Sequence, residues 1–284
     1  MASEQVNTEQ EEQKALLVFT DLDGTLLDHH DYSFSAADTA LKALAVQGIP
    51  LIINTSKTCS EVMALREQLN NLYRVQPQPF VVENGAGIYL PQDSDFSCRG
   101  LQQTASGLLR LDLATPRESV LDILHAIRRE HGLAFTGFAD MSVADVQRET
   151  GLSEAAAKQA LARDYTEPLL WQDSEEARQQ LVQSLRAKGL QILEGGRFWH
   201  VMSAANKGKA MQVLSSCYKQ PATTIALGDG GNDIAMLEAA DWPVVIKAAS
   251  KASLKLAHKN AIYSKSEGPV GWNTTVQDLL TKLT

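Results

Sequence analysis

The chain has 284 residues, of which 44% are hydrophobic, so it can bury one large core or two modest ones. A formal net charge of −8 excludes the basic surface that nucleic-acid binding requires. No apolar run approaches the roughly 20 residues of a membrane-spanning helix, which excludes a protein built on such helices.

Residues 1–13 are polar and acidic and lack the apolar centre of a signal peptide, which predicts a disordered tail on a cytoplasmic protein. Cys59, Cys98 and Cys217 have neither paired nor metal-binding spacing, and we expect them to be reduced thiols. The sequence leaves the oligomeric state open.

The first structured element is an apolar run over residues 16–20, which predicts a buried strand that Gly24 ends. Asp21 and Asp23 follow it, where a parallel strand opens into a loop and α/β sheets bind ligands. A carboxylate there either holds a hard cation such as Mg²⁺ or attacks phosphorus to form an aspartyl-phosphate. The D-x-D-G pattern alone also fits an Asp-Gly turn with a solvated acid.

The next elements alternate between helix and strand. A capping-box pattern at residues 35–38 starts a helix, and the apolar run 49–54 leads to Thr55. A second capping box, from Thr58 to Glu61, opens another helix, and a short strand follows at 80–82. Strands separated by helices of this length indicate parallel pairing through right-handed crossovers.

The stretch 88–201 interrupts this alternation with elements of its own. Helices are predicted after Pro116 and Ser174, and short strands at 107–113, 190–193 and 197–201, which together form an inserted α+β module.

After this insertion the alternation resumes. Lys207 opens an amphipathic helix, and a strand over 223–227 leads to Asp229, Asn232 and Asp233. Residues 268–273 are predicted to form a turn-rich loop before a final helix.

Acids, a hydroxyl, a lysine and further acids in this order resemble the four motifs of the haloacid dehalogenase-like phosphohydrolases. The resemblance implies an α/β fold, with a doubly wound parallel-sheet (Rossmann-like) core and an inserted α+β cap domain that sets substrate specificity. The core would comprise residues 14–87 and 202–284, and the cap residues 88–201.

The reaction expected from this resemblance is phosphate-ester hydrolysis. Asp21 is the expected nucleophile because it is the first polar side chain after the strand, and Asp23 is the expected general acid and base. Lys207 and Thr55 would hold the phosphoryl oxygens. The alternatives are that Thr55 caps the following helix, and that Lys207 is solvated while Lys209 takes its place.

The same resemblance implies a Mg²⁺ site. The metal ligands would be Asp21, Asp229 and the backbone carbonyl of Asp23. We expect Asn232 and Asp233 to orient the waters of the metal, or Lys207, without binding the ion directly.

Four further segments, at residues 83–88, 163–168, 196–200 and 268–273, resemble mannosyl-3-phosphoglycerate phosphatases. The substrate of that family carries a phosphate, a carboxylate and a mannose. Arg163 and Arg197 would meet the carboxylate, and Trp199 or Trp272 would stack on the sugar. Equally, Trp199 would belong to the core of the cap and Arg163 would pair with Glu167.

Three other functions stay open at this point. One is a phosphatase of broader sugar-phosphate range, and another is a phosphomannomutase-like enzyme, which returns the phosphoryl group to a sugar. The third is a binding module that has kept the fold and lost turnover, although the acids, the hydroxyl and the lysine are all present.

Overall fold

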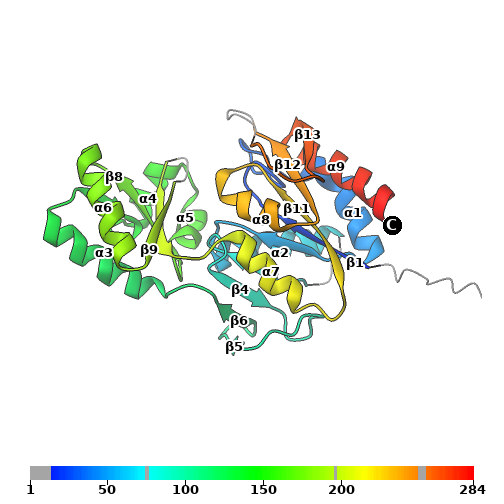
Figure 1. Cartoon of the computed structure of the whole chain (residues 1–284), viewed down its shortest axis with the longest axis horizontal. Coiled ribbons are helices and arrows are strands. Elements are labelled where there is room, and N and C mark those ends of the chain that lie inside the picture. Colours follow the sequence, from blue (N-terminus) through cyan, green and yellow to red (C-terminus); the bar gives the residue numbers. More distant parts are fainter. Residues whose placement is uncertain (1–13, 74–76, 195–196, 249–253) are drawn as a thin grey trace, which may run out of the picture.

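The computed structural model describes residues 14–284 apart from 74–76, 195–196 and 249–253, and the predicted tail 1–13 lies outside the described residues. The chain forms a large body around a nine-stranded sheet and a smaller body around a four-stranded sheet, which lies to one side in Figure 1. No helix in the described part of the chain is long and apolar enough to cross a membrane.

The large sheet is parallel in its central part and antiparallel at one end. In sheet order its strands are β13 (Ile262–Glu267), β12 (Trp242–Lys247), β11 (Ala222–Gly228), β1 (Ala15–Thr20), β2 (Leu51–Asn54), β3 (Phe80–Val82), β4 (Gly87–Leu90), β6 (Leu109–Asp112) and β5 (Gln102–Gln103). The central strands read as continuous apolar runs because helices cover both of their faces.

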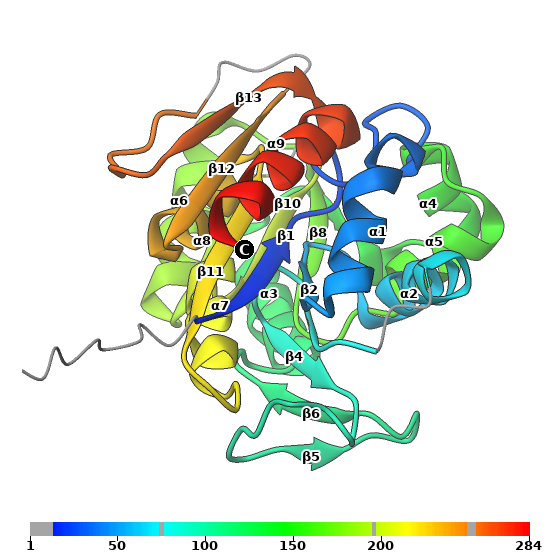
Figure 2. The ribbon, with the colours of Figure 1, turned by 90° about the vertical axis from the view of Figure 1, so that its right-hand side faces the viewer.

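Helices cover the sheet on both sides, as expected for a doubly wound fold. One face carries α1 (Asp38–Gln47), α2 (Cys59–Tyr73) and α9 (Gly268–Leu283) in one apolar cluster. The opposite face carries α7 (Lys207–Ser216) and α8 (Ile234–Ala239) in a second cluster. Figure 2 shows α1 and α2 on the opposite side of β1 and β2 from α7 and α8.

The smaller body, which we call the cap, is an antiparallel sheet with helices. Its strands, in sheet order, are β7 (Phe135–Gly137), β8 (Glu167–Trp171), β10 (Trp199–Ser203) and β9 (Leu190–Glu194). Helices α3 (Arg117–His131) and α6 (Glu175–Ala187) pack on one face through an apolar cluster. Helices α4 (Val143–Thr150) and α5 (Glu154–Leu161) pack on one another.

Two boundaries differ from the sequence-based expectation. The insertion was expected to begin at residue 88, whereas β4, β6 and β5 extend the large sheet, because antiparallel hairpins add to the edge of β3. Residues 268–273 were expected to form a loop, whereas they form the first turns of α9. Pro269 in the first turn is compatible with a helix start, since an N–H there has no intrahelical partner.

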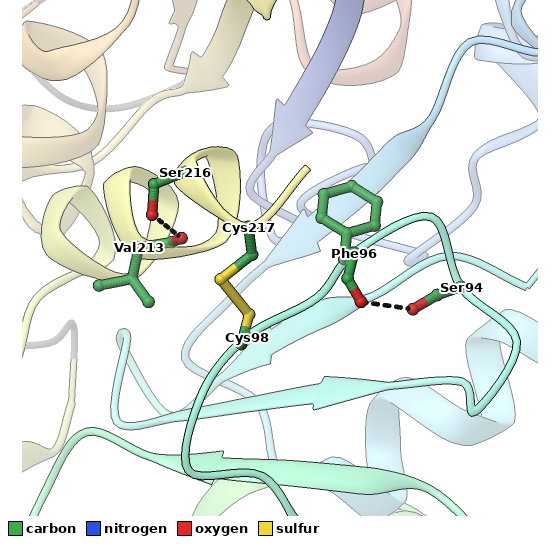
Figure 3. Close-up of a disulfide and its surroundings, with 6 residues drawn as sticks. All are labelled: Ser94, Phe96, Cys98, Val213, Ser216 and Cys217. Atoms are coloured by element: carbon green, nitrogen blue, oxygen red, sulfur yellow. Dashed lines mark hydrogen bonds between the residues drawn. A yellow bond between two sulfur atoms is a disulfide. The ribbon is translucent and has the colours of Figure 1, made fainter. Parts of the chain in front are cut away.

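A disulfide corrects the expectation of reduced thiols. Cys98 and Cys217 are bonded, with their Cα atoms 5.1 Å apart (Figure 3). The segment around Cys98 runs antiparallel to the end of α7, and the Ser97 N–H donates to the Cys217 carbonyl oxygen at 2.7 Å. The spacing gave no sign of this pair because 119 residues separate the two cysteines. Cys59 is a free thiol.

Candidate active site

Three carboxylates meet at the carboxyl edge of the parallel sheet. Asp21 follows β1, and Asp229 and Asp233 follow β11, the strand paired with β1. One oxygen from each of the three lies within 4.8 Å of the others. Asp21 and Asp229 were expected as metal ligands, and the third carboxylate of the group belongs to Asp233, which was expected to orient the waters of the metal or Lys207.

Lys207 lies within this acidic group. It is fully buried at the start of α7, and its Nζ is 2.5 Å from Asp21 Oδ1 and 2.7 Å from Asp233 Oδ1. The Asn206 side chain caps the helix by accepting from the Lys209 N–H at 2.8 Å. Lys207 is therefore not a solvated helix-start lysine, whereas Lys209, the alternative, is exposed.

Burial and the neighbouring charges shift the pKa values of Asp21 and Lys207. Burial raises the pKa of Asp21 to about 8, and the neighbouring Asp233 carboxylate adds to this rise while Lys207 opposes it. Burial favours the neutral form of Lys207, but Asp21 and Asp233 outweigh it and raise its pKa. Asp21 and Asp233 thus share the ammonium of Lys207, and a divalent cation bound by the grouped carboxylates would add positive charge there.

The donor set fits Mg²⁺, which prefers carboxylate oxygens over nitrogen or sulfur. The Thr25 hydroxyl donates to Asp229 Oδ1 at 3.1 Å and so orients that carboxylate. Gly24 has a φ of +79°, and a Cβ there would lie 2.8 Å from Asp229 Oδ2. Glycine is therefore required where the first loop passes the acidic group.

Asp23 lies apart from the three carboxylates. Its Oδ1 is 2.9 Å from Lys57 Nζ, and its side chain is 37% exposed. Lys57, to which the sequence analysis gave no role, also lies over the Tyr32 ring at 5.3 Å from its centroid. The only feature of the sequence that could have indicated a role for Lys57 in the site was its position two residues after Thr55.

Thr55 is fully buried at the end of β2 and does not cap α2. Its Oγ1 accepts from the Lys57 N–H at 3.3 Å. Thr58 caps the helix instead, since its Oγ1 accepts from the Glu61 N–H at 3.2 Å and Glu61 accepts from the Thr58 N–H at 2.8 Å. The hydroxyl of Thr55 is therefore not needed by the helix.

A left-handed loop adjoins this site. Glu83, Asn84 and Gly85 have φ values of 48°, 60° and 93° in succession. A Cβ at Gly85 would collide with the Asn206 carbonyl oxygen, just before Lys207. Asn84 Oδ1 accepts from Asn232 Nδ2 at 3.0 Å, so Asn232 holds this loop. The loop thereby joins the segments that carry Lys207 and Asp229.

Glu83 connects the same loop to the cap, a role that sequence reasoning missed. Its carboxylate is fully buried and accepts from the N–H groups of Asp164, Tyr165 and Thr166 at 2.8, 3.2 and 2.8 Å. It also accepts from the Thr166 hydroxyl at 2.7 Å. The positive φ of Glu83 costs free energy because Glu83 is not a glycine, and these hydrogen bonds offset that cost.

Arg163 belongs to this junction. Its side chain is 5% exposed, and its Nε lies 3.4 Å from Glu83 Oε2. Its Nη2 donates to the Ser56 carbonyl oxygen at 2.8 Å, beside Thr55. Arg163 thus pairs with Glu83 and not with Glu167, which instead pairs with Arg117.

The other residues expected to bind substrate are engaged elsewhere. Arg197 is 59% exposed and pairs with Glu149 at 2.5 Å. Trp199 stacks on Trp171, 5.6 Å between centroids, in the cluster under α3 and α6, which fits its alternative as a residue of the cap core. Trp272 is fully buried in the large body and donates to Thr20 Oγ1 at 3.0 Å, so the expectation that it stacks on a sugar is wrong.

His200 is a further polar group of the cap that the sequence analysis did not single out. Residues alternate along β10, and because Trp199 and Val201 pack in the cluster under the helices, His200 lies on the other face of the sheet. Its Nδ1 is buried without a hydrogen-bond partner among the described residues. Burial, and then the charge of Arg163, lowers the pKa of His200 to about 3, so the imidazole is neutral.

Comparison with known proteins agrees with this geometry. The family model of the haloacid dehalogenase-like hydrolases matches residues 18–271. A protein of Methanococcoides burtonii named glucosyl-3-phosphoglycerate/mannosyl-3-phosphoglycerate phosphatase is 37% identical over 271 residues, 94% of this chain and 97% of that protein. A protein of the same name from Persephonella marina is 33% identical over 274 residues, 94% of this chain and 98% of its own length.

Solved structures share the fold at low sequence identity. A protein from Thermoplasma acidophilum has a TM-score of 0.65 and 14% identity, with 95% of this chain and 100% of that one covered. A haloacid dehalogenase-like hydrolase from Bacteroides thetaiotaomicron has a TM-score of 0.64 and 19% identity, with 94% and 100% covered. The chain therefore belongs to the haloacid dehalogenase-like hydrolases and, within them, to the family of the glucosyl-3-phosphoglycerate/mannosyl-3-phosphoglycerate phosphatases.

Proposed function

We propose that this protein is a Mg²⁺-dependent phosphatase that hydrolyses mannosyl-3-phosphoglycerate to mannosylglycerate and phosphate through an aspartyl-phosphate on Asp21. The observation that carries the proposal is the buried contact between Asp21 and Lys207, surrounded by Asp229 and Asp233. A buried carboxylate beside an ammonium at the edge of a parallel sheet suits nucleophilic attack on phosphorus.

In the first step Asp21 attacks phosphorus, and the bond from phosphorus to the glycerate oxygen breaks. Asp23 donates a proton to the leaving alkoxide. Lys207 and Thr55 bind the phosphoryl oxygens, whose charge must be balanced as the bonds change. The fixed position of Lys207, 2.5 Å from Asp21 Oδ1, supports this role because no side-chain movement is needed to place the charge.

In the second step water attacks phosphorus, Asp23 takes the proton from that water, and the carboxylate of Asp21 is released. One water molecule is consumed and one phosphate leaves. Mg²⁺, held by Asp21, Asp229 and the backbone carbonyl of Asp23, with Asp233 close by, would supply positive charge to the phosphoryl group.

Lys57 and His200 are the groups we propose for recognition of the rest of the substrate. Lys57 is paired with Asp23 at 2.9 Å, and we propose that it binds the glycerate carboxylate. His200, whose Nδ1 has no hydrogen-bond partner among the described residues, would bind a sugar hydroxyl. Arg163 connects the cap to the large body through its pair with Glu83, while Arg197 and Trp199 have partners within the cap.

A substrate panel tests the proposal. Phosphate release would be measured with Mg²⁺ for mannosyl-3-phosphoglycerate, its glucosyl counterpart, mannose 6-phosphate and 3-phosphoglycerate. We expect kcat/KM for the two glycosylated glycerates to exceed that for mannose 6-phosphate by at least about 100-fold, or roughly 2.7 kcal/mol. Equal or better turnover of hexose phosphates would favour the broader phosphatase. Phosphoryl transfer to a sugar, without release of phosphate, would favour the mutase.

A further inference from the structure

A cavity of about 790 Å³ lies away from the site described above, between α1, α2 and the face of the sheet beneath them. We call it the α1–α2 cavity, and its walls include the apolar side chains Leu44, Leu51, Ile53, Leu69 and Phe80. Neither the three carboxylates nor Lys207 line it. Its volume is within the range of about 300–1,000 Å³ that accommodates small-molecule ligands.

Among the described residues that line this apolar space, one is a cation. The guanidinium of Arg66 lies over the ring of Phe80, 4.6 Å from its centroid, and its Nη2 donates to the Gln78 carbonyl oxygen at 2.7 Å. Its Nη1 contacts Met63 Sδ at 3.5 Å. No carboxylate of the described residues forms an ion pair with Arg66, although the exposed Glu67 also lines the cavity.

The surroundings of Arg66 favour an anionic ligand. Burial lowers the pKa of Arg66 to about 10, which leaves the side chain charged at neutral pH. A partly desolvated charge without a counter-ion is unfavourable, and a carboxylate that binds it gains an ion pair in a low-dielectric setting. The planar guanidinium also presents several N–H donors in the geometry that carboxylates accept.

We propose that the α1–α2 cavity binds a small amphipathic carboxylate, whose head group pairs with Arg66 and whose hydrocarbon body covers the apolar wall. The ligand class follows from Arg66, the one cation among the described lining residues, set in a wall of leucine, isoleucine and phenylalanine. A medium-chain fatty acid has this combination of one charge and an unbranched apolar body.

The cavity reaches the junction between the cap and the large body. Gln159 of α5 lines it, and the Gln159 carbonyl oxygen accepts from the Thr58 hydroxyl at 2.9 Å. A bound ligand would therefore touch α2 and the cap together. The proposal does not depend on the phosphatase reaction, because none of its binding groups take part in it.

The test uses decanoate as the probe and the full-length chain, by isothermal titration calorimetry, with decanol as the uncharged control. We expect saturable one-to-one binding of decanoate below about 1 mM, at least about tenfold tighter than decanol. Asp21→Asn should bind decanoate as the wild type does, so loss of phosphatase function and loss of this site are distinguishable. Equal affinity for decanoate and decanol, or no saturable binding, would overturn the proposal without any variant.

A pair of arginine variants then locates the site. Arg66→Met keeps an apolar stem of similar length, and it should weaken decanoate binding at least about tenfold while changing decanol binding less than about twofold. Arg128→Met is the matched control, because Arg128 also stacks on a phenylalanine, Phe135, at 3.8 Å, but lies in the cap. Arg66→Lys keeps the positive charge and serves as the test variant if Arg66→Met does not fold. Its affinity for decanoate should lie between those of the wild type and Arg66→Met. Unchanged decanoate binding in folded Arg66→Met would overturn the assignment.

Discussion

Replacement of Glu83 by glutamine tests the connection between the site and the cap. The carboxylate accepts four hydrogen bonds from residues 164–166, of which only the Asp164 N–H reaches Oε1. An amide NH₂ at the Oε1 position would face that N–H, and Arg163 would lose its charge partner. Loss of one charged hydrogen bond and of a buried counter-ion costs about 3–5 kcal/mol.

The assay compares two substrates that differ in their need for the cap. For mannosyl-3-phosphoglycerate, a cap-docking loss of this size should lower kcat/KM by about 150- to 5,000-fold. For p-nitrophenyl phosphate, which is too small to reach the cap, the fall should stay within about threefold. Tyr89→Phe is the control, because it removes one hydrogen bond of 2.9 Å to Asp164 and leaves the Glu83–Arg163 pair intact.

The result that would refute this reasoning is an equal fall for both substrates. It would show that Glu83 maintains the large body, or the loop beside Lys207, and not the docking of the cap. Thermal unfolding of each variant should be recorded in parallel, so that rates refer to folded protein.

Three further predictions concern the pH dependence of stability, the metal and the disulfide. The pKa of His200 is lowered from 6.5 to about 3 in the folded protein. Between these two pH values the unfolded chain binds a proton at this histidine that the folded protein does not bind, so the free energy of unfolding should decrease as the pH falls from about 6.5 toward 3. The loss is at most about 1.4 kcal/mol per pH unit, and urea unfolding at several pH values should show a flatter profile for His200→Asn. Asp229→Asn removes one of three grouped carboxylates, so the rise in Tm that Mg²⁺ produces in the wild type should shrink; an undiminished rise would place the ion elsewhere. Because the disulfide closes a loop of 119 residues, Cys98→Ser should lower the free energy of unfolding by about 2–5 kcal/mol, and dithiothreitol should destabilise the wild type but not the variant.

Much of the catalytic edge was predictable because it depends on local patterns. Apolar runs ended at Asp21, Thr55 and near Asp229, and parallel pairing of β1 with β11 and β2 then brings these ends to one edge. The start of α7 at Lys207 followed from the amphipathic pattern after Asn206. The family resemblance supplied the roles, which local patterns alone leave open.

The features that were missed depend on contacts between distant segments. Trp272 looked available for a ligand, but α9 packs it against Thr20 beneath β1, 252 residues earlier in the sequence. Glu83 entered the sequence analysis only as part of the segment 83–88, whereas its partners lie about 80 residues away in the cap. Side-chain type does not reveal such partners, and the same holds for the antiparallel strands that extend the sheet beyond β3.

The central claim is that Asp21 becomes phosphorylated during hydrolysis of mannosyl-3-phosphoglycerate. The most direct measurement is peptide mass spectrometry after rapid acid quenching of enzyme, Mg²⁺ and substrate. We expect a phosphoryl group on the peptide that contains Asp21 in the wild type, and neither that group nor phosphate release in Asp21→Asn. Sustained phosphate release by Asp21→Asn, or phosphorylation at another residue in the wild type, would contradict the account.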